Sequence, residues 1–297
     1  MSINKNIELL IELNISTKSS LEVFHRSTRD IDNLNVLKCN QSGVIVLERV
    51  EVDDSYYEEN IHYTNEFKGE THVKNGVILT TPLEDDVRRF ESYKELINNS
   101  KILDFGCGKG RFIQLTQEVS KRSVGVELNK VNREYINDIG IQCVNHLSEL
   151  NNEKFDLITL NHVFEHLNDP VNILIELKKY LKSDGIIIIE VPHARDLLLE
   201  TFNLESFKDF IFWSEHLILH TRESLKSFGR SSGLQVKKIE GFQRYPVSNH
   251  FNWLLNGKPS GHDIYKHLNN KVFSEQYESL LDSIDQTDTL IGYFGIN

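Results

Sequence analysis

One short stretch, in which an apolar run and an acid lead into alternating glycines, constrains this chain more than any other. Residues 101–110 read Lys-Ile-Leu-Asp-Phe-Gly-Cys-Gly-Lys-Gly. The apolar run predicts a buried parallel strand, and the glycines allow a tight turn whose backbone approaches a ligand closely. We expect a helix to follow from about Arg111. This order of elements predicts an α/β fold with a nucleotide-type pocket at the carboxyl end of a doubly wound sheet.

The spacing of the glycines distinguishes between cofactors. A dinucleotide-binding fingerprint has the pattern G-x-G-x-x-G, and the third of those positions is Arg111 in this chain. The stretch instead resembles the D-x-G-x-G-x-G signature of class I S-adenosylmethionine-dependent methyltransferases. The resemblance implies that five residues here contact S-adenosylmethionine: Asp104, Gly106, Cys107, Gly108 and Gly110. The ordinary alternative is a glycine-rich turn without a ligand.

An acid at the end of the next predicted strand supports a nucleoside ligand. Residues 123–128 read as that strand, and Glu127 follows the glycines by about twenty residues. A carboxylate there can accept hydrogen bonds from both ribose hydroxyls. An NAD-dependent oxidoreductase has an acid in the same place, so Glu127 indicates a ribose and leaves the cofactor open. The resemblance adds Leu128, Leu147 and Asn161 to the cofactor contacts.

Strands and helices alternate regularly through the rest of the core. Asp169 and Pro170 give the helix after the fourth strand an N-cap and a first-turn proline. The predicted strands from the third to the seventh are 141–145, 155–161, 185–192, 234–240 and 289–296. The resemblance implies a Rossmann-like seven-stranded methyltransferase sheet whose last strand is antiparallel. It divides the chain into an N-terminal accessory region (1–95) of hairpin and helix, and a methyltransferase domain (96–297) with an insert at about 243–286.

The candidate catalytic residues follow the fourth strand, where open α/β sheets bind their ligands. His162 and Glu165 are placed to face cofactor and substrate, by analogy with the fold. Residues 162–166 also match the H-x-x-E-H pattern of a class of zinc peptidases, but that chemistry needs the motif within a helix. We therefore expect no metal, and His166 is as well explained by a structural role. His216 lies in a segment that resembles a recurring part of these methyltransferases, which makes it a third catalytic candidate.

The predicted insert is rich in side chains that bind polar ligands. We predict that the basic residues and histidines of the insert bind a phosphate of the substrate, and that a tyrosine stacks on its sugar or base. These five residues are Arg244, Tyr245, His250, Lys258 and His262. The alternative is a structural insert whose polar groups bond one another. The insert resembles that of methyltransferases of bacterial sugar and surface-polysaccharide biosynthesis, which implies methyl transfer to a hydroxyl of a sugar or nucleotide-linked sugar. An oxidoreductase, a noncatalytic S-adenosylmethionine-binding module and a zinc peptidase are the other functions considered.

The net charge and the cysteine content limit the kinds of substrate and bound metal that we expect. A net charge of −11 and a pI near 5.6 argue against a nucleic-acid substrate, which favours a basic surface. The three cysteines form no disulfide framework, and Ser42 stands where a zinc-binding C-x-x-C pair beginning at Cys39 would have its second cysteine. No window has the apolar length of a membrane span, and the N-terminus lacks the features of a secretory signal. We therefore expect a cytoplasmic protein with a small-molecule substrate, and the oligomeric state stays open.

Overall fold

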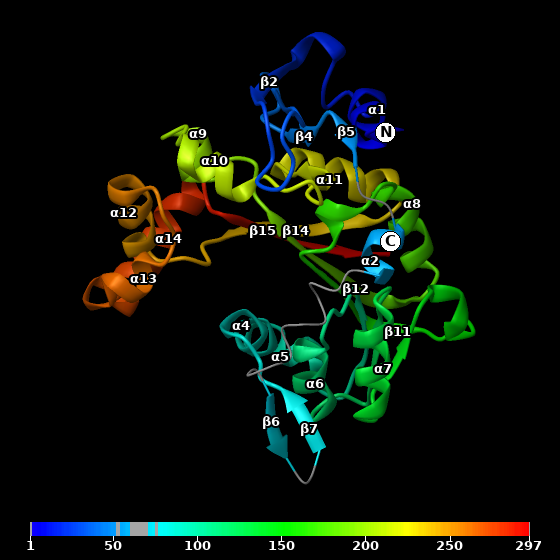
Figure 1. Cartoon of the computed structure of the whole chain (residues 1–297). Coiled ribbons are helices and arrows are strands. Elements are labelled where there is room, and N and C mark those ends of the chain that lie inside the picture. The colour runs from blue at the N-terminus through cyan, green and yellow to red at the C-terminus, as the bar shows by residue number, and fades with distance from the viewer. Residues whose placement is uncertain (1, 52–53, 60–70, 75–76, 297) are drawn as a thin grey trace.

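A seven-stranded sheet runs through the centre of the protein (Figure 1). The structure is a computed structural model that describes residues 2–51, 54–59, 71–74 and 77–296. In spatial order the strands are β10 (Gln142–Val144), β9 (Arg122–Val126), β8 (Lys101–Phe105), β11 (Phe155–Asn161), β12 (Leu181–Pro192), β15 (Thr289–Gly295) and β14 (Gln235–Phe242).

The direction of the strands confirms the predicted α/β methyltransferase sheet. The first five strands in this order are parallel, and β15 is antiparallel to both β12 and β14. After β8 the chain forms β9 on one side of β8, and it later forms β11 on the other side of β8. This reversal opens a crevice at the carboxyl ends of β8 and β11, where the glycine turn and residues 162–166 lie.

Helices cover both faces of the sheet because alternate strand residues point in opposite directions. Ile102, Leu157 and Ile188 pack with residues of α4, α5 and α6, whereas Leu103 and Ile187 pack with residues of α8 and α11. The helix bounds are α4 (Glu84–Ser92), α5 (Lys94–Ile97), α6 (Arg111–Gln117), α7 (Lys130–Asp138), α8 (Pro170–Lys178) and α11 (Arg222–Ser231). The predicted cap of α8 is present, since the Asp169 side chain accepts a hydrogen bond from the Asn172 amide.

Two boundaries differ from those predicted. The helix expected in the N-terminal region is divided at Tyr93 into α4 and α5, because the Tyr93 backbone leaves the helical region and its side chain is buried. Strand β12 begins at Leu181, before the predicted start at residue 185. Its pairing with β11 is irregular at that point, so the strand contains a bulge.

The N-terminal region is joined to the core by a shared sheet. The predicted hairpin is formed by β3 and β4, and β4 also pairs with β13, where Ile218 lies opposite Val46. At the N-cap of α1, the Asn4 amide donates to the carbonyl of Leu47 at 3.0 Å and to that of Leu217 at 2.8 Å. The division at residue 95 stays a prediction. The elements here are β1 (Ser2–Ile3), α1 (Lys5–Glu12), η1 (Lys18–Ser20), β2 (Leu21–His25), β3 (Val36–Cys39), β4 (Ile45–Leu47), β5 (Arg49–Val50), α2 (Asp54–Glu59), β6 (Thr71–Lys74), β7 (Val77–Thr80) and β13 (Ile218–Leu219).

The insert is helical and stands to one side of the sheet, at the left of Figure 1. Some of its polar groups bond one another, as the structural alternative expects: the Asn252 amide donates to the carbonyls of Lys258 and Pro259. None of the helices in the described part of the chain has the length and apolarity of a bilayer-spanning segment. The insert contains α12 (Val247–Asn256), α13 (Gly261–Ile264), η4 (Lys266–Leu268) and α14 (Lys271–Ser283); the remaining elements are η2 (Leu147–Leu150), η3 (Phe164–His166), α9 (Leu197–Glu200) and α10 (Glu205–Ile211).

Candidate active site

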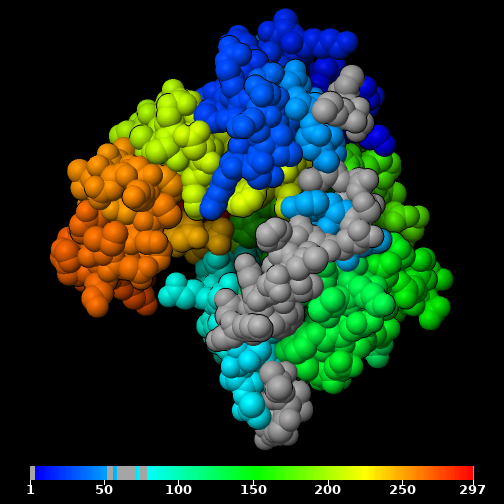
Figure 2. All heavy atoms as spheres, in the orientation of Figure 1, coloured from blue at the N-terminus to red at the C-terminus, as the bar shows by residue number. Residues whose placement is uncertain are grey.

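Two cavities meet at the carboxyl edge of the sheet. The glycine-turn cavity has a volume of about 640 Å³, and the insert cavity has a volume of about 550 Å³. His162 lines both of them. Figure 2 shows the insert, in orange, standing apart from the segment drawn in cyan, with a recess between them. The glycine-turn cavity is lined by Tyr57, Gly106, Gly108, Glu127, Leu128 and Leu147, among others, and the insert cavity by Arg89, Glu165, Phe210, His216, Arg244 and Trp253, among others.

Two of the predicted glycines face the first cavity. Gly106 has a φ of +73°, and a Cβ there would lie 2.5 Å from Val163 Cγ2. Gly108 has a φ of +52° with nothing within 4 Å of its Cβ position, so its backbone is open to a ligand. Gly110 begins α6 and its Cβ position faces Ile136. The turn therefore presents Gly106 and Gly108, while Gly110 packs beneath it.

Glu127 is held at the cavity by backbone amides. Its Oε2 accepts from the Gly108 amide and its Oε1 from the Asn129 amide, each at 2.7 Å. Burial raises the pKa of the Glu127 carboxyl, against the effect of these hydrogen bonds. Each oxygen retains a lone pair for a ribose hydroxyl. With Leu128 and Leu147 lining the same cavity, these residues fit the nucleoside part of S-adenosylmethionine.

Besides Gly110, three residues that were predicted to contact the cofactor do not line the glycine-turn cavity. Asp104 is buried behind the turn, where it accepts hydrogen bonds from Thr159 and Asn161, and burial raises its pKa to about 6. Asn161 lines the insert cavity. The Cys107 sulfur lies 3.7 Å from that of Cys143, so this side chain packs under the turn. Contacts of Asp104 and Cys107 with the cofactor stay predictions, and their described contacts support the turn from below.

His162 adopts a left-handed backbone conformation directly after β11, with a φ of +53°. Its Nδ1 lies 3.2 Å from Glu165 Oε1 and its Nε2 lies 3.3 Å from Glu190 Oε1. Both glutamates are fully buried. Burial and the nearby Arg244 lower the pKa of His162, but the two carboxylates outweigh them and raise it above its usual value.

Glu190 is a site residue that the sequence analysis missed. Its carboxylate accepts from Arg88 at 2.7 Å and from Arg89 at 2.6 Å. Burial raises the pKa of Glu190, but His162 and Arg89 hold it well below its ordinary value. The available signal was one acid at the end of an apolar strand, Ile186–Val191. Such a group is buried only with a charged partner, and here it has three.

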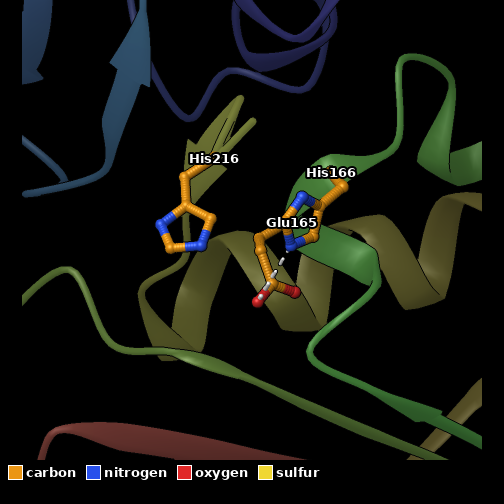
Figure 3. Close-up of side chains that lie close together, drawn as sticks. All are labelled: Glu165, His166 and His216. Atoms are coloured by element: carbon orange, nitrogen blue, oxygen red, sulfur yellow. Dashed lines mark ion pairs between the residues drawn. The ribbon is translucent and has the colours of Figure 1, made fainter. Parts of the chain in front are cut away.

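Glu165, which lies 3.2 Å from His162, converges with two further histidines, His166 and His216, as Figure 3 shows. Glu165, His166 and His216 each place one side-chain nitrogen or oxygen atom within 4.8 Å of the others. Burial would raise the pKa of Glu165, but the hydrogen bond from His162 and the adjacent histidines lower it to about 2. Burial, with His166 nearby, lowers the pKa of His216 to about 4. The cluster therefore combines a carboxylate with two neutral imidazoles at neutral pH.

The insert and the segment before it form the far wall of the insert cavity. Four of the five predicted substrate residues line it: Arg244, Tyr245, His250 and His262. The fifth, Lys258, is exposed and lies outside this lining. The Arg244 guanidinium forms an ion pair with Asp85. Before the insert in the chain, the Phe207 and Phe210 rings of α10 each lie 5.1 Å from the Trp253 ring of α12.

Comparison with known proteins identifies the family. A family model described as a methyltransferase domain matches residues 78–239, more than half of the chain. An uncharacterized protein of Methanocaldococcus jannaschii is 32% identical over 159 residues, which are 53% of this chain and 59% of that protein, less than two thirds of its length. A ubiquinone biosynthesis O-methyltransferase of Haemophilus ducreyi is 23% identical over 185 residues, covering 52% of this chain and 73% of the relative. A crystal structure of an S-adenosylmethionine-dependent methyltransferase from Archaeoglobus fulgidus aligns with a TM-score of 0.47 and 20% identity, over 70% of this chain and 91% of that one. The chain belongs to the methyltransferase-domain family, with S-adenosylmethionine as its cofactor.

Proposed function

We propose that the protein transfers a methyl group from S-adenosylmethionine in the glycine-turn cavity to a hydroxyl of a sugar or nucleotide-linked sugar in the insert cavity. The observation that carries this proposal is the position of His162, which lines both cavities. Methyl transfer requires the donor carbon and the acceptor oxygen to meet in line. Two cavities that share one titratable wall suit that requirement.

The cofactor supplies an electrophilic methyl group, and the protein supplies position and a proton acceptor. Glu127 and the glycine turn hold the nucleoside, and α10 with the insert encloses the acceptor. His162 accepts the proton of the acceptor hydroxyl. Its Nδ1 lies 3.2 Å from Glu165 Oε1, and its Nε2 lies 3.3 Å from Glu190 Oε1 without forming a hydrogen bond to any described residue. Since an effective base has a pKa near the working pH, His162 suits this role better than His216, whose pKa is about 4.

The lining of the insert cavity supports a polar acceptor with an apolar face. Phe207, Phe210 and Trp253 provide an aromatic wall, in which the two phenylalanine rings are tilted or edge-on against Trp253. Asp85 and Arg244 face the same space and provide charged hydrogen-bonding groups. Side chains of both kinds suit a ring that carries hydroxyls. A nucleotide-linked sugar would add a diphosphate, which would meet Arg244 on the cavity wall, beside its ion-pair partner Asp85.

A phenolic hydroxyl is the second candidate acceptor. It is favoured by the similarity to ubiquinone biosynthesis O-methyltransferases, at 23% identity for the Haemophilus ducreyi protein. The same aromatic wall would stack on a phenol ring. The two candidates differ in whether the cavity must bind a diphosphate, so they predict different roles for Arg244.

A panel of acceptors with one matched pair of variants separates these candidates. The protein is incubated with S-adenosylmethionine and either nucleoside-diphosphate sugars or prenylated catechols, and methylated product is followed by mass spectrometry. We expect a methylated sugar, and we expect Arg244→Gln to raise the acceptor KM by about tenfold or more, since it removes a charge-assisted hydrogen bond. Lys266→Gln, at an exposed position of the same insert, is the control and should leave KM unchanged.

The product found with the acceptor panel distinguishes the sugar acceptor from the other candidate functions. A methylated catechol with no methylated sugar would replace the sugar acceptor by the phenolic one. Binding of S-adenosylhomocysteine without turnover on either panel would support a noncatalytic binding module. Tighter binding of NAD than of S-adenosylhomocysteine would favour an oxidoreductase and would contradict the proposal.

A further inference from the structure

We propose that Glu165, His166 and His216 form a binding site for one divalent transition-metal ion, of which Zn²⁺ is the representative. The site lies where the two cavities meet: Glu165 and His216 line the insert cavity, and His166 lines the glycine-turn cavity. It revises the expectation of a metal-free protein, because His216 is fifty residues from the H-x-x-E-H motif and only the fold brings it there.

The ligand atoms are of the right kind and close together. Two imidazole nitrogens and one carboxylate oxygen are a common set for zinc, with an open fourth position in catalytic sites. All three atoms lie within 4.8 Å of one another, and His166 Nε2 lies 3.8 Å from Glu165 Oε1. A tetrahedral ion with bonds of 2.0–2.1 Å needs separations of about 3.3 Å. Small side-chain rotations within the cluster would bring the atoms to that spacing.

Each histidine has its other ring nitrogen occupied, as metal-binding histidines do. His166 Nδ1 lies 3.3 Å from the Tyr57 hydroxyl and 3.9 Å from Glu215 Oε2. His216 Nδ1 lies 3.2 Å from the carbonyl oxygen of Ile211. These contacts orient both rings and leave the two Nε2 atoms on the side of Glu165. Figure 3 shows the His166 ring beside the Glu165 carboxylate, with His216 across from them.

A second, independent observation points to a ligand. Glu165 is 0% exposed, and its Oε2 has no hydrogen-bond partner among the described residues. Leaving a buried carboxylate oxygen unpaired is costly. A cation bound by this carboxylate through Oε2, or through both of its oxygens, would satisfy that atom. If the protein acts as proposed above, an ion held by these residues would border the insert cavity, which Glu165 and His216 line, and would polarise the acceptor oxygen there.

The test measures metal binding directly and needs no activity. Untagged full-length protein is stripped with chelator, and Zn²⁺ is titrated in by calorimetry, with bound metal counted by elemental analysis after gel filtration. We expect about one Zn²⁺ per chain, with affinity reduced by 100-fold or more in Glu165→Gln and His216→Gln, because a lost ligand costs at least as much as the 10–100-fold of a lost supporting contact. His267→Gln, which removes an exposed histidine of the insert, should bind Zn²⁺ as the wild type does.

Titration with S-adenosylhomocysteine distinguishes the loss of the metal site from the loss of the cofactor site and from misfolding. Each variant is also titrated with S-adenosylhomocysteine, and retained affinity shows that the fold and the cofactor site are intact. Wild-type protein that binds S-adenosylhomocysteine but no Zn²⁺ would overturn the metal site and leave the methyltransferase proposal standing. Stoichiometric Zn²⁺ that persists in both ligand variants would place the ion elsewhere and would also overturn it.

Discussion

Replacing His162 with asparagine is expected to lower kcat by about 10²–10⁴ while the affinity for S-adenosylhomocysteine stays within a few-fold of the wild type. This range is the usual contribution of a general base. We expect a selective effect because the cofactor contacts assigned to Glu127 and the glycine turn do not depend on the His162 side chain. Steady-state kinetics with the acceptor found in the panel, together with calorimetry for the cofactor product, measure the two effects separately.

Asparagine is chosen because His162 has a φ of +53°, a conformation that asparagine adopts more readily than alanine does. A local backbone change is thereby avoided. His267→Asn, at an exposed position of the insert, controls for the loss of a histidine and should retain the wild-type kcat. A His162→Asn enzyme that turns over at the wild-type rate would remove His162 as the base.

Replacing Glu190 with alanine is expected to lower the free energy of unfolding by about 3–5 kcal/mol, the range for breaking a buried ion pair. Its carboxylate is 0% exposed and binds two arginines, of which Arg89 is itself buried. Without Glu190, the ion-pair partner left to Arg89 among the described residues is the more distant Asp86, at 3.6 Å. Urea unfolding followed by circular dichroism measures the loss.

A surface ion pair provides the matched control. Glu153 contacts Lys101 at 2.8 Å, but the Lys101 side chain is 39% exposed. Glu153→Ala should therefore cost no more than about 1 kcal/mol. Equal losses in the two variants would show that burial does not distinguish these pairs, and the structural role given to Glu190 would be wrong.

The sequence was sufficient where local signals and chain order determine the structure. The glycine spacing predicted the turn around Gly106 and Gly108, and the apolar runs predicted the positions of the strands; the antiparallel direction of β15 was implied by the resemblance to methyltransferases. The order of strands follows because right-handed connections between parallel strands leave few alternatives.

The sequence was insufficient where groups distant in the chain meet. Neither the pairing of β13 with β4 nor the contact of Arg88 and Arg89 with Glu190 has a local signal. Neighbouring residues on a helix, such as Arg88 and Arg89, point in different directions, which argues against a shared partner. Both side chains are long enough to reach the same buried acid. For the same reason, the convergence of His216 on Glu165 and His166 became visible only in the structure.

Calorimetric titration of S-adenosylhomocysteine into the wild type and into Glu127→Ala tests whether the glycine turn and Glu127 bind S-adenosylmethionine. We expect the wild type to bind this ligand more tightly than NAD, and Glu127→Ala to lose about 1.5–3 kcal/mol of binding free energy, as for hydrogen bonds to a charged group. Glu134→Ala, at an exposed position on α7, should bind as the wild type does. An unchanged affinity in Glu127→Ala, or a preference for NAD, would contradict the account.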